Sequence, residues 1–352
     1  MPILASFGGA SARGFNPGGS SFDWGQFSTG DVYQGGYIRV VTPGSYLHWW
    51  FYPTQRSNGQ TQQGSTLTNT VTLEGGVQAR FHVFGGGGGG SGANGSGGGG
   101  GGYAATSNYT TLSKGQIISY QAGTAGLGGA RVAQSGVSNV NYLGNSSPAN
   151  QSTSGASSSV YLGTNSGTSD LSLLANGGTF SIAGNPTDYS NCGQGGSASI
   201  VRNELGLSTV SGSGGNGGSR TLRGATTVSG GGGGGGNNHE GTGKDTGGSS
   251  TYAGGGGGGA GNGQTPSSSQ NGGGSGGTHG FPGGIGGDST NSAPLKFGSN
   301  GEDLKSQVSA TLPRGGGYAY QASDNTAWGS TVLGRGSAGA GGFPGGGGGS
   351  SY

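Results

Sequence analysis

Hydrophobic and polar residues alternate at period two in part of the chain, which predicts β-strands there. Residues 68–73 and 77–84 both show this alternation, and Glu74-Gly75-Gly76 lies between them as a turn. The β-branched and aromatic stretch 37–52, interrupted by Pro43-Gly44, predicts two further strands joined by a turn. No segment has the 3.6-residue periodicity of an amphipathic helix. We therefore expect a mostly irregular and β-rich fold with essentially no α-helix.

From residue 85 onward, glycine-rich runs alternate with segments rich in Ser, Thr, Asn and Tyr. The chain has 352 residues, of which 96 are Gly, whereas Gly makes up about 7% of an average protein. Charged residues are 7% and hydrophobic residues 28% of the chain, so the composition cannot build a large aliphatic core. The glycine-rich runs are 85–102, 123–129, 212–218, 230–236, 254–263, 272–287 and 334–349.

Two of these runs have a spacing of three residues. Gly recurs at every third position from Gly274 to Gly286 and from Gly336 to Gly348. This period matches the polyproline II helix, which has three residues per turn and no internal hydrogen bonds. Where the contact positions are Gly, no Cβ keeps neighbouring helices apart, and their backbones can bond to one another.

We therefore expect two parts of the chain. The aromatic and β-branched residues predict that 1–65 forms a small β-rich attachment or assembly module. The glycine spacing predicts that 66–352 forms a sandwich of polyglycine II helices with polar connecting loops. Two alternatives for the glycine runs stay open, namely flexible linkers and an ordinary β-sandwich with glycine-rich loops.

Charge and hydropathy argue against several classes of partner. The formal net charge is +2, and the basic residues form no block, which argues against nucleic-acid binding. Cys192 is the single cysteine, so no intrachain disulfide is possible. The first five residues lack a basic region followed by a long apolar run, so no classical export signal is expected. No apolar stretch approaches the about 20 residues that a membrane-spanning helix needs, and we expect no membrane insertion.

No catalytic motif has the context that its chemistry requires. Gly243-Lys244 is followed by Asp245 rather than by Ser or Thr, so it is not a P-loop. Residues 273–277 match Gly-x-Ser-x-Gly without a strand and a helix around them. His82 lies in a strand pattern, where packing is its expected role. We therefore predict no enzyme, no cofactor and no metal, although a carbohydrate-cleaving carboxylate pair stays open. The other candidates are dispersed: His48, His239, His279, Asp288, Glu302, Asp303 and Asp324.

Several segments together resemble the glycine-rich domain of phage tail-fibre proteins. A predicted strand runs directly into six glycines at 85–90, and another glycine block follows at 97–102. Residues 112–123 begin Leu-Ser-Lys-Gly-Gln, like the leucine–polar–Gly–Gln strand of that domain. Glycine runs that alternate with unequal polar segments are also similar to the distal adhesins of T-even-like long tail fibres. Residues 6–15 resemble amino-terminal segments of phage virion proteins, but the attachment domain of those adhesins is not recognisable in residues 1–65.

The resemblance implies a non-enzymatic virion protein, made in the host cytoplasm and carried on the extracellular particle. Loops between its glycine helices would contact a bacterial surface protein or polysaccharide, and its N-terminal region would contact other virion or tail proteins. A homo-oligomer is compatible with it. The alternatives are a purely structural virion component without receptor contact and, in another class, an ice-binding or extracellular-matrix glycine-rich protein.

The polar loops have the Tyr, Ser, Asn and Thr content of a binding surface. Tyr supplies contact area at a low entropic cost, and small polar residues adapt their hydrogen bonds to a partner. An alternative role for the aromatic residues is to cap the ends of the glycine helices. Alternate loops of such a bundle emerge at the same end. The predicted receptor-contacting residues are Tyr142, Tyr161, Tyr189, Tyr252, Tyr318, Tyr320 and Trp328.

Overall fold

The described part of the chain is almost entirely β-structure and extended segments. Its single helical turn is the 3-10 helix η1 (Trp24–Gln26). The prediction of a β-rich fold with essentially no α-helix is confirmed for these residues. The computed structural model describes residues 22–44, 46–51, 53, 66–90, 97–126, 153–181, 192–218, 224–227 and 248–251, and for their backbone the strands at 3–8, 318–319 and 339–340.

Two antiparallel sheets contain nearly all of the described strands, and a separate pair contains the last two. In chain order the strands are β1 (Ile3–Gly8), β2 (Val32–Tyr33), β3 (Gly36–Thr42), β4 (Tyr46–Phe51), β5 (Leu67–Thr72), β6 (Val77–Phe84), β7 (Tyr103–Thr106), β8 (Thr110–Leu112), β9 (Ile117–Ala122), β10 (Ser158–Leu162), β11 (Leu171–Ala175), β12 (Ala198–Asn203), β13 (Thr209–Gly212), β14 (Tyr318–Ala319) and β15 (Gly339–Ala340).

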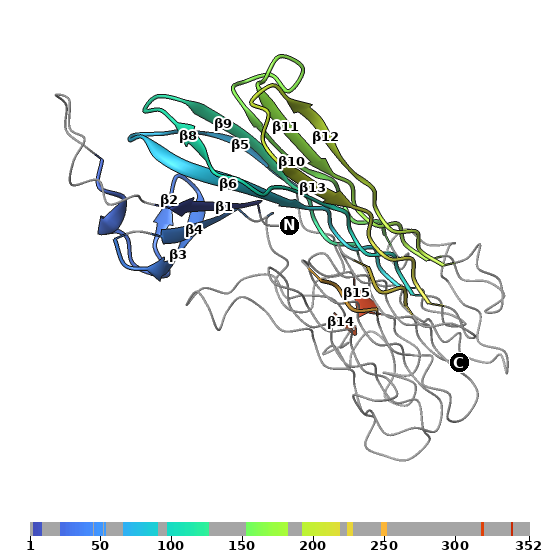
Figure 1. Cartoon of the computed structure of the whole chain (residues 1–352). Coiled ribbons are helices and arrows are strands. Elements are labelled where there is room, and N and C mark those ends of the chain that lie inside the picture. Colours follow the sequence, from blue (N-terminus) through green and yellow to red (C-terminus); the bar gives the residue numbers. More distant parts are fainter. Residues whose placement is uncertain are drawn as a thin grey trace, which may run out of the picture.

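The first sheet, sheet 1, has the order β13-β7-β6-β1-β4-β3-β2, with β8 also paired to β6. The second, sheet 2, has the order β12-β11-β10-β9-β5. Figure 1 shows the two sheets layered against each other, with β1–β4 extending sheet 1 to one side. β1 lies between β4 and β6, so the N-terminal strands belong to the same sheet as β6. Strands from both sides of the predicted boundary at residue 65 thus pair in sheet 1.

The strands expected at 37–52 and at 68–84 are confirmed as β3 and β4 and as β5 and β6. β3 and β4 pair with each other around Gly44, whose φ of 71° suits glycine. β5 and β6 do not pair with each other, because β5 pairs with β9 in sheet 2. Glu74-Gly75-Gly76 therefore carries the chain from one sheet to the other.

The core lies between the two sheets and is largely aromatic where the N-terminal strands meet it. Trp49 and Phe81 of sheet 1 are 0% exposed, and Tyr120 of sheet 2 is 1% exposed. The rings of Phe51 and Tyr120 lie 4.1 Å apart across the two sheets. Such aromatic pairs contribute about 0.5–1.5 kcal/mol beyond the burial of their area. Aromatic side chains thus join a core that elsewhere is mainly aliphatic, with Leu73, Leu112 and Leu171 fully buried.

Gln34 joins the edge of sheet 2 to sheet 1. It lies in the β2–β3 turn at φ 44°, in the left-handed region, ahead of Gly35 at φ 82°. Its side-chain amide donates to the Thr72 carbonyl at 2.9 Å and accepts from the Thr72 N–H at 3.1 Å. These are the groups that a neighbouring strand would supply, so the amide completes the edge of β5 in place of a strand.

Replacing Phe81 tests the core. We expect Phe81→Ala to lower the free energy of unfolding by about 3–5 kcal/mol, because it leaves a cavity between the sheets. Denaturant unfolding followed by tryptophan fluorescence measures the change. Gln78→Ala, at an exposed position of the same strand, is the control and should change the free energy by less than about 0.5 kcal/mol. Equal stability of the two variants would contradict the described core.

Tyr120 gives the fold a dependence on alkaline pH. Burial raises the pKa of its hydroxyl to about 12, and the Asn69 side chain opposes this only in part. The folded-state pKa is above the usual Tyr value of about 10, so this contribution to stability is complete below pH 10 and is lost as pH rises to 12.

We expect Tyr120→Phe to lose less stability than the unaltered chain between pH 10 and pH 12. Denaturant unfolding at a series of pH values measures the difference. Groups that both proteins share, such as Tyr33, whose pKa burial also raises, cancel in the comparison. Parallel pH profiles would rule out a buried neutral phenol at position 120.

Candidate functional site

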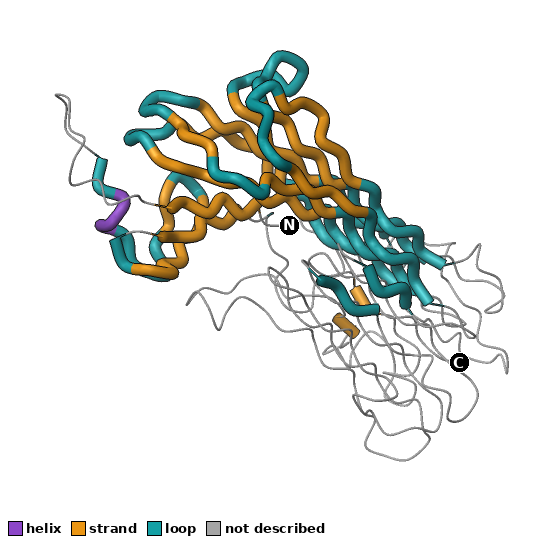
Figure 2. Tube along the Cα trace, in the orientation of Figure 1, coloured by secondary structure: helices purple, strands orange, loops and turns teal. Residues whose placement is uncertain are grey.

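The two sheets continue at one end into glycine-rich segments that keep the strand order. Sheet 1 continues into a first layer, in which 85–90 follows β6, 97–102 precedes β7 and 213–218 follows β13. Figure 2 shows these segments as teal tubes that run on from the orange strands. Sheet 2 continues into the second layer, made of 123–126, 153–157, 176–181 and 192–197. We call the two layers together the glycine lattice.

Backbone hydrogen bonds between segments of the glycine lattice recur at every third residue. N–H groups three residues apart in one segment bond to carbonyls three residues apart in one neighbouring segment. The N–H group of the next residue in the donor segment bonds to a different neighbouring segment. Examples, with the donor first, are Gly85–Gly102 and Gly88–Gly99 within the first layer, and Gly86–Ala156 and Gly89–Thr153 between the layers.

The two layers of the glycine lattice touch through their backbones. Gly102 donates to the Asn176 carbonyl at 2.9 Å and Gly99 donates to the Thr179 carbonyl at 3.0 Å, each bond crossing from the first layer to the second. Packed β-sheets, by contrast, lie about 10 Å apart because side chains fill the space between them. The sandwich therefore changes from side-chain packing to direct backbone bonding along its length.

Glycine is required at the contact positions because any Cβ would meet a neighbouring carbonyl. A Cβ added at Gly178 would lie closer than 3.0 Å to the Gly99 carbonyl, and one added at Gly99 would meet the carbonyl of Gln194. Gly86 is blocked in the same way by Thr124. Real Cβ atoms do not approach so closely, so the lattice cannot accept a side chain at these positions without moving a segment.

The chain leaves and re-enters the glycine lattice repeatedly at its end remote from the strands. The connecting segments are 91–96, 127–152 and 182–191, so their lengths are very unequal. Their structure lies outside the described residues. Gly89, however, donates to the Thr153 carbonyl and accepts from the Ser181 N–H, so the residues at which these segments join the lattice lie side by side. The prediction that alternate loops emerge at one end is confirmed for these attachment points.

The structure describes the side chain of one predicted receptor-contacting residue, Tyr161. This residue lies in β10 between Val160 and Leu162, which point into the core, so Tyr161 is half-buried on the outer face of sheet 2. Tyr318 lies in β14, and its side chain is outside the described residues. In sequence, Tyr142 and Tyr189 belong to connecting segments of the lattice end. The remaining predicted residues outside the described part are Tyr252, Tyr320 and Trp328.

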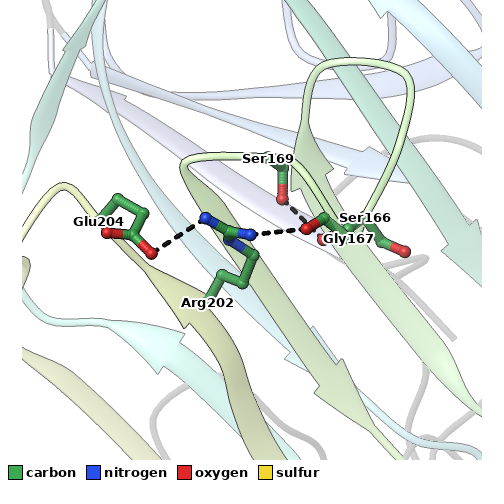
Figure 3. A network of polar contacts seen from close by, with 5 residues as sticks. All are labelled: Ser166, Gly167, Ser169, Arg202 and Glu204. Atoms are coloured by element: carbon green, nitrogen blue, oxygen red, sulfur yellow. Dashed lines mark hydrogen bonds and ion pairs between the residues drawn. The ribbon is translucent and has the colours of Figure 1, made fainter.

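Charged side chains are confined to the strand half of the described sandwich. None of the glycine lattice segments named above carries a charge. Figure 3 shows one charged group, in which Arg202 donates to the Gly167 carbonyl at 2.6 Å and to Glu204 at 3.0 Å. Between residues 66 and 218 the described charged residues are Glu74, Arg80, Lys114, Asp170, Arg202 and Glu204.

Buried histidines occur in sheet 1. His82 is 3% exposed, and its Nδ1 lies 2.8 Å from the Tyr103 hydroxyl, which fits the packing role expected for it. His48 is also buried, with Nε2 at 2.9 Å from the Tyr46 hydroxyl. Within the described ranges, no group of three or more His, Cys, Asp and Glu residues is arranged to hold a metal ion. Nor does the described part contain a helix with the length and apolar character needed to cross a bilayer.

Sequence reasoning missed the polar residues on the outward positions of the lattice. Asn176 and Thr179 are three residues apart, and Asn216 follows Ser213 by three. The signal was present, because these residues interrupt glycine at the same period of three. The two runs with the strictest period of three, 274–286 and 336–348, lie outside the described residues.

Comparison of the chain with protein-family models, with curated proteins and with solved structures finds no match. A function is therefore inferred from the sequence and from the geometry described above. The charge-free glycine lattice with its unequal connecting segments is the main structural support for it.

Gly178→Ala tests the lattice. We expect it to destabilise the chain by at least about 1–3 kcal/mol, because the added methyl group forces two bonded segments apart. Gly76→Ala is the matched control, because the nearest atom to its Cβ would be the Leu112 carbonyl oxygen at 3.5 Å, an ordinary contact. It should leave stability unchanged or raise it by about 0.4–1 kcal/mol. Thermal unfolding of both variants would reveal the difference, and equal midpoints would refute close backbone packing at Gly178.

Proposed function

We propose that this chain is a non-enzymatic phage virion protein, a tail-fibre or tail-tip adhesin, in which a polyglycine II sandwich holds receptor-contacting loops. The period-three hydrogen bonds support the first part of the proposal. A helix with three residues per turn directs successive residues to three different sides. Segments that bond to a different neighbour at each successive residue have the contacts expected of such helices.

The polyglycine II assignment also explains how so much glycine is held in order. Fixing one backbone residue costs about 1–2 kcal/mol in conformational entropy, and glycine loses the most freedom of any residue. An isolated glycine helix cannot offset this cost. Bonds to several neighbours at once, as at Gly86, which donates to Ala156 and accepts from Gly178, supply the cooperative compensation that a linker lacks.

The observation that carries the adhesin role is the common attachment of the connecting segments at the lattice end. Binding residues are found disproportionately on loops that a rigid scaffold positions. The lattice is such a scaffold, and it tolerates connections as different in length as 91–96 and 127–152. Tyr142 and Tyr189 belong to these connections, so they are the strongest of the predicted contacts with a bacterial surface protein or polysaccharide.

The remaining parts of the proposal follow from the resemblance to phage tail-fibre proteins. The N-terminal region would dock on other virion or tail proteins, and the protein would act on the extracellular particle. A structural virion component without receptor contact is the competing role. The two roles differ in whether the isolated protein binds cells.

Binding of the fluorescently labelled chain to bacteria that the phage infects tests the adhesin role. We expect saturable binding that Tyr142→Ala or Tyr189→Ala weakens by about tenfold or more, the effect of removing an aromatic hot spot. Tyr161→Ala, on the outer face of sheet 2, is the matched control and should bind like the unaltered chain. Flow cytometry over a concentration series gives the apparent Kd. A folded chain that fails to bind these cells would exclude the adhesin role and leave the structural one.

A further inference from the structure

Thr179 and Gln194 lie opposite each other at the base of the connecting segment 182–191. The outgoing arm, 176–181, leads from the strands to this segment, and the returning arm, 192–197, leads back to them. The N–H of Thr179 in the outgoing arm donates to the Gln194 carbonyl in the returning arm at 2.8 Å. Of the described residues that bond one arm to the other, these two lie closest to 182–191.

A second bond joins the same two residues, and it uses the Thr179 side chain. The Gln194 N–H donates to Thr179 Oγ1 at 2.6 Å. In an antiparallel sheet this N–H would donate to the backbone carbonyl of the opposite residue. The Thr179 carbonyl, however, already accepts from the Gly99 N–H of the first layer at 3.0 Å. The hydroxyl therefore lets Thr179 bond twice to the returning arm and once to the first layer.

The residues at which 182–191 joins the two arms are buried. Ser181 is 0% exposed and donates to the Gly89 carbonyl at 3.1 Å. Cys192 is 5% exposed, and its carbonyl accepts from Gln194 Nε2 at 3.2 Å. Both ends of the segment are thus attached to the lattice, and a chain with fixed ends has fewer conformations to lose when it binds.

The preceding level of the two arms, three residues nearer the strands, is bonded differently. Asn176 donates through its backbone N–H to the Ser197 carbonyl at 2.8 Å and through Nδ2 to Ser197 Oγ at 2.9 Å. The side-chain bond here joins two side chains. The arms also continue directly into β11 and β12, which pair with each other. Loss of the Ser197 hydroxyl should therefore leave the spacing of the arms at 182–191 unchanged.

We propose that Thr179 is a positioning residue for receptor binding, because its hydroxyl fixes the spacing of the two arms between which Tyr189 lies. This inference rests on the proposed adhesin role. Thr179 acts through 182–191 and does not itself touch the receptor. Preorganisation reduces the entropic cost of ordering a binding segment, and the apparent Kd rises by the factor by which the binding-competent population falls.

Replacement of Thr179 by Val and by Ser tests the proposal. Thr179→Val keeps the branched shape and removes the acceptor. We expect it to raise the apparent Kd for the bacteria about threefold to tenfold, which corresponds to the net contribution of one hydrogen bond. Thr179→Ser keeps the acceptor and should bind like the unaltered chain. Flow cytometry of the labelled full chain gives the Kd. Ser197→Ala is the matched control at the preceding level and should leave the Kd unchanged.

Combination with tyrosine variants shows whether Thr179 acts through Tyr189. In the Tyr189→Ala background, Thr179→Val should change the Kd by less than about twofold, because the contact that it positions is already lost. In the Tyr142→Ala background it should keep its full effect, because Tyr142 lies in the other segment, 127–152. Direct contact of Thr179 with the receptor, or a general loss of stability, would instead weaken binding in both backgrounds.

Amide hydrogen exchange checks the bond itself. The Gln194 amide should lose protection in Thr179→Val and keep it in Thr179→Ser. The amides of Gly178 and Gly196 donate to the first layer, so their protection shows that the lattice is intact in each variant. If Thr179→Val loses protection at Gly178, Thr179→Ala replaces it in the same comparison.

Three results would overturn the inference while leaving the adhesin role in place. They are an unchanged Kd for Thr179→Val while Tyr189→Ala still weakens binding, an undiminished effect of Thr179→Val in the Tyr189→Ala background, and retained protection of the Gln194 amide in Thr179→Val. Absence of binding by the folded, unaltered chain would instead overturn the adhesin role and this inference together.

Discussion

The absence of Cβ atoms at the contact positions is the constraint on which the rest of the structure depends. Side chains hold two packed sheets about 10 Å apart, and no backbone bond can cross that distance. In the glycine lattice, the first layer donates directly to carbonyls of the second, as Gly102 does to Asn176. A single methyl group at Gly178 or Gly99 would meet a neighbouring carbonyl, so the composition is a steric requirement of this packing.

The strand half and the glycine half are stabilised by different interactions. The strands bury Trp49, Phe81 and Tyr120 between the sheets and gain stability from apolar and aromatic area. The glycine segments have no such area and depend on hydrogen bonds to neighbours on several sides. Because the strand order passes unchanged from one half to the other, the sheets fix the register of the first glycine residues, such as Gly85 opposite Gly102.

Charged and uncharged residues are also separated along the molecule. The described charges of the sandwich lie with the strands, as in the Arg202–Glu204 pair, whereas the lattice segments are charge-free. Polar side chains of the lattice accept from backbone N–H groups of neighbouring segments, as Thr179 does from Gln194 and Asn216 from Gly195. In the proposed adhesin, the strands would then supply the stable base and the lattice would carry the variable connections away from it.

The sequence alone determined the local elements and the glycine contacts that they permit. Period-two alternation predicted the strands at 68–84, aromatic and β-branched residues predicted those at 37–52, and glycine density excluded α-helix. These features are local, because strand alternation and the missing Cβ act on a residue and its immediate neighbours. For the same reason, the sequence indicated that glycine segments could approach one another.

Only the tertiary structure decided which segments meet. It placed β5 and β6 in different sheets, although one short turn joins them, and it set β1 between β4 and β6. It also decided that Gln34 completes the edge of β5 and that Tyr161 lies on an outer sheet face. The lattice segments 85–90 and 97–102 consist entirely of glycine, so they carry no side chains by which one partner could be told from another. Their pairing is therefore set by the strands that precede or follow them, through contacts distant in the sequence that no local pattern records.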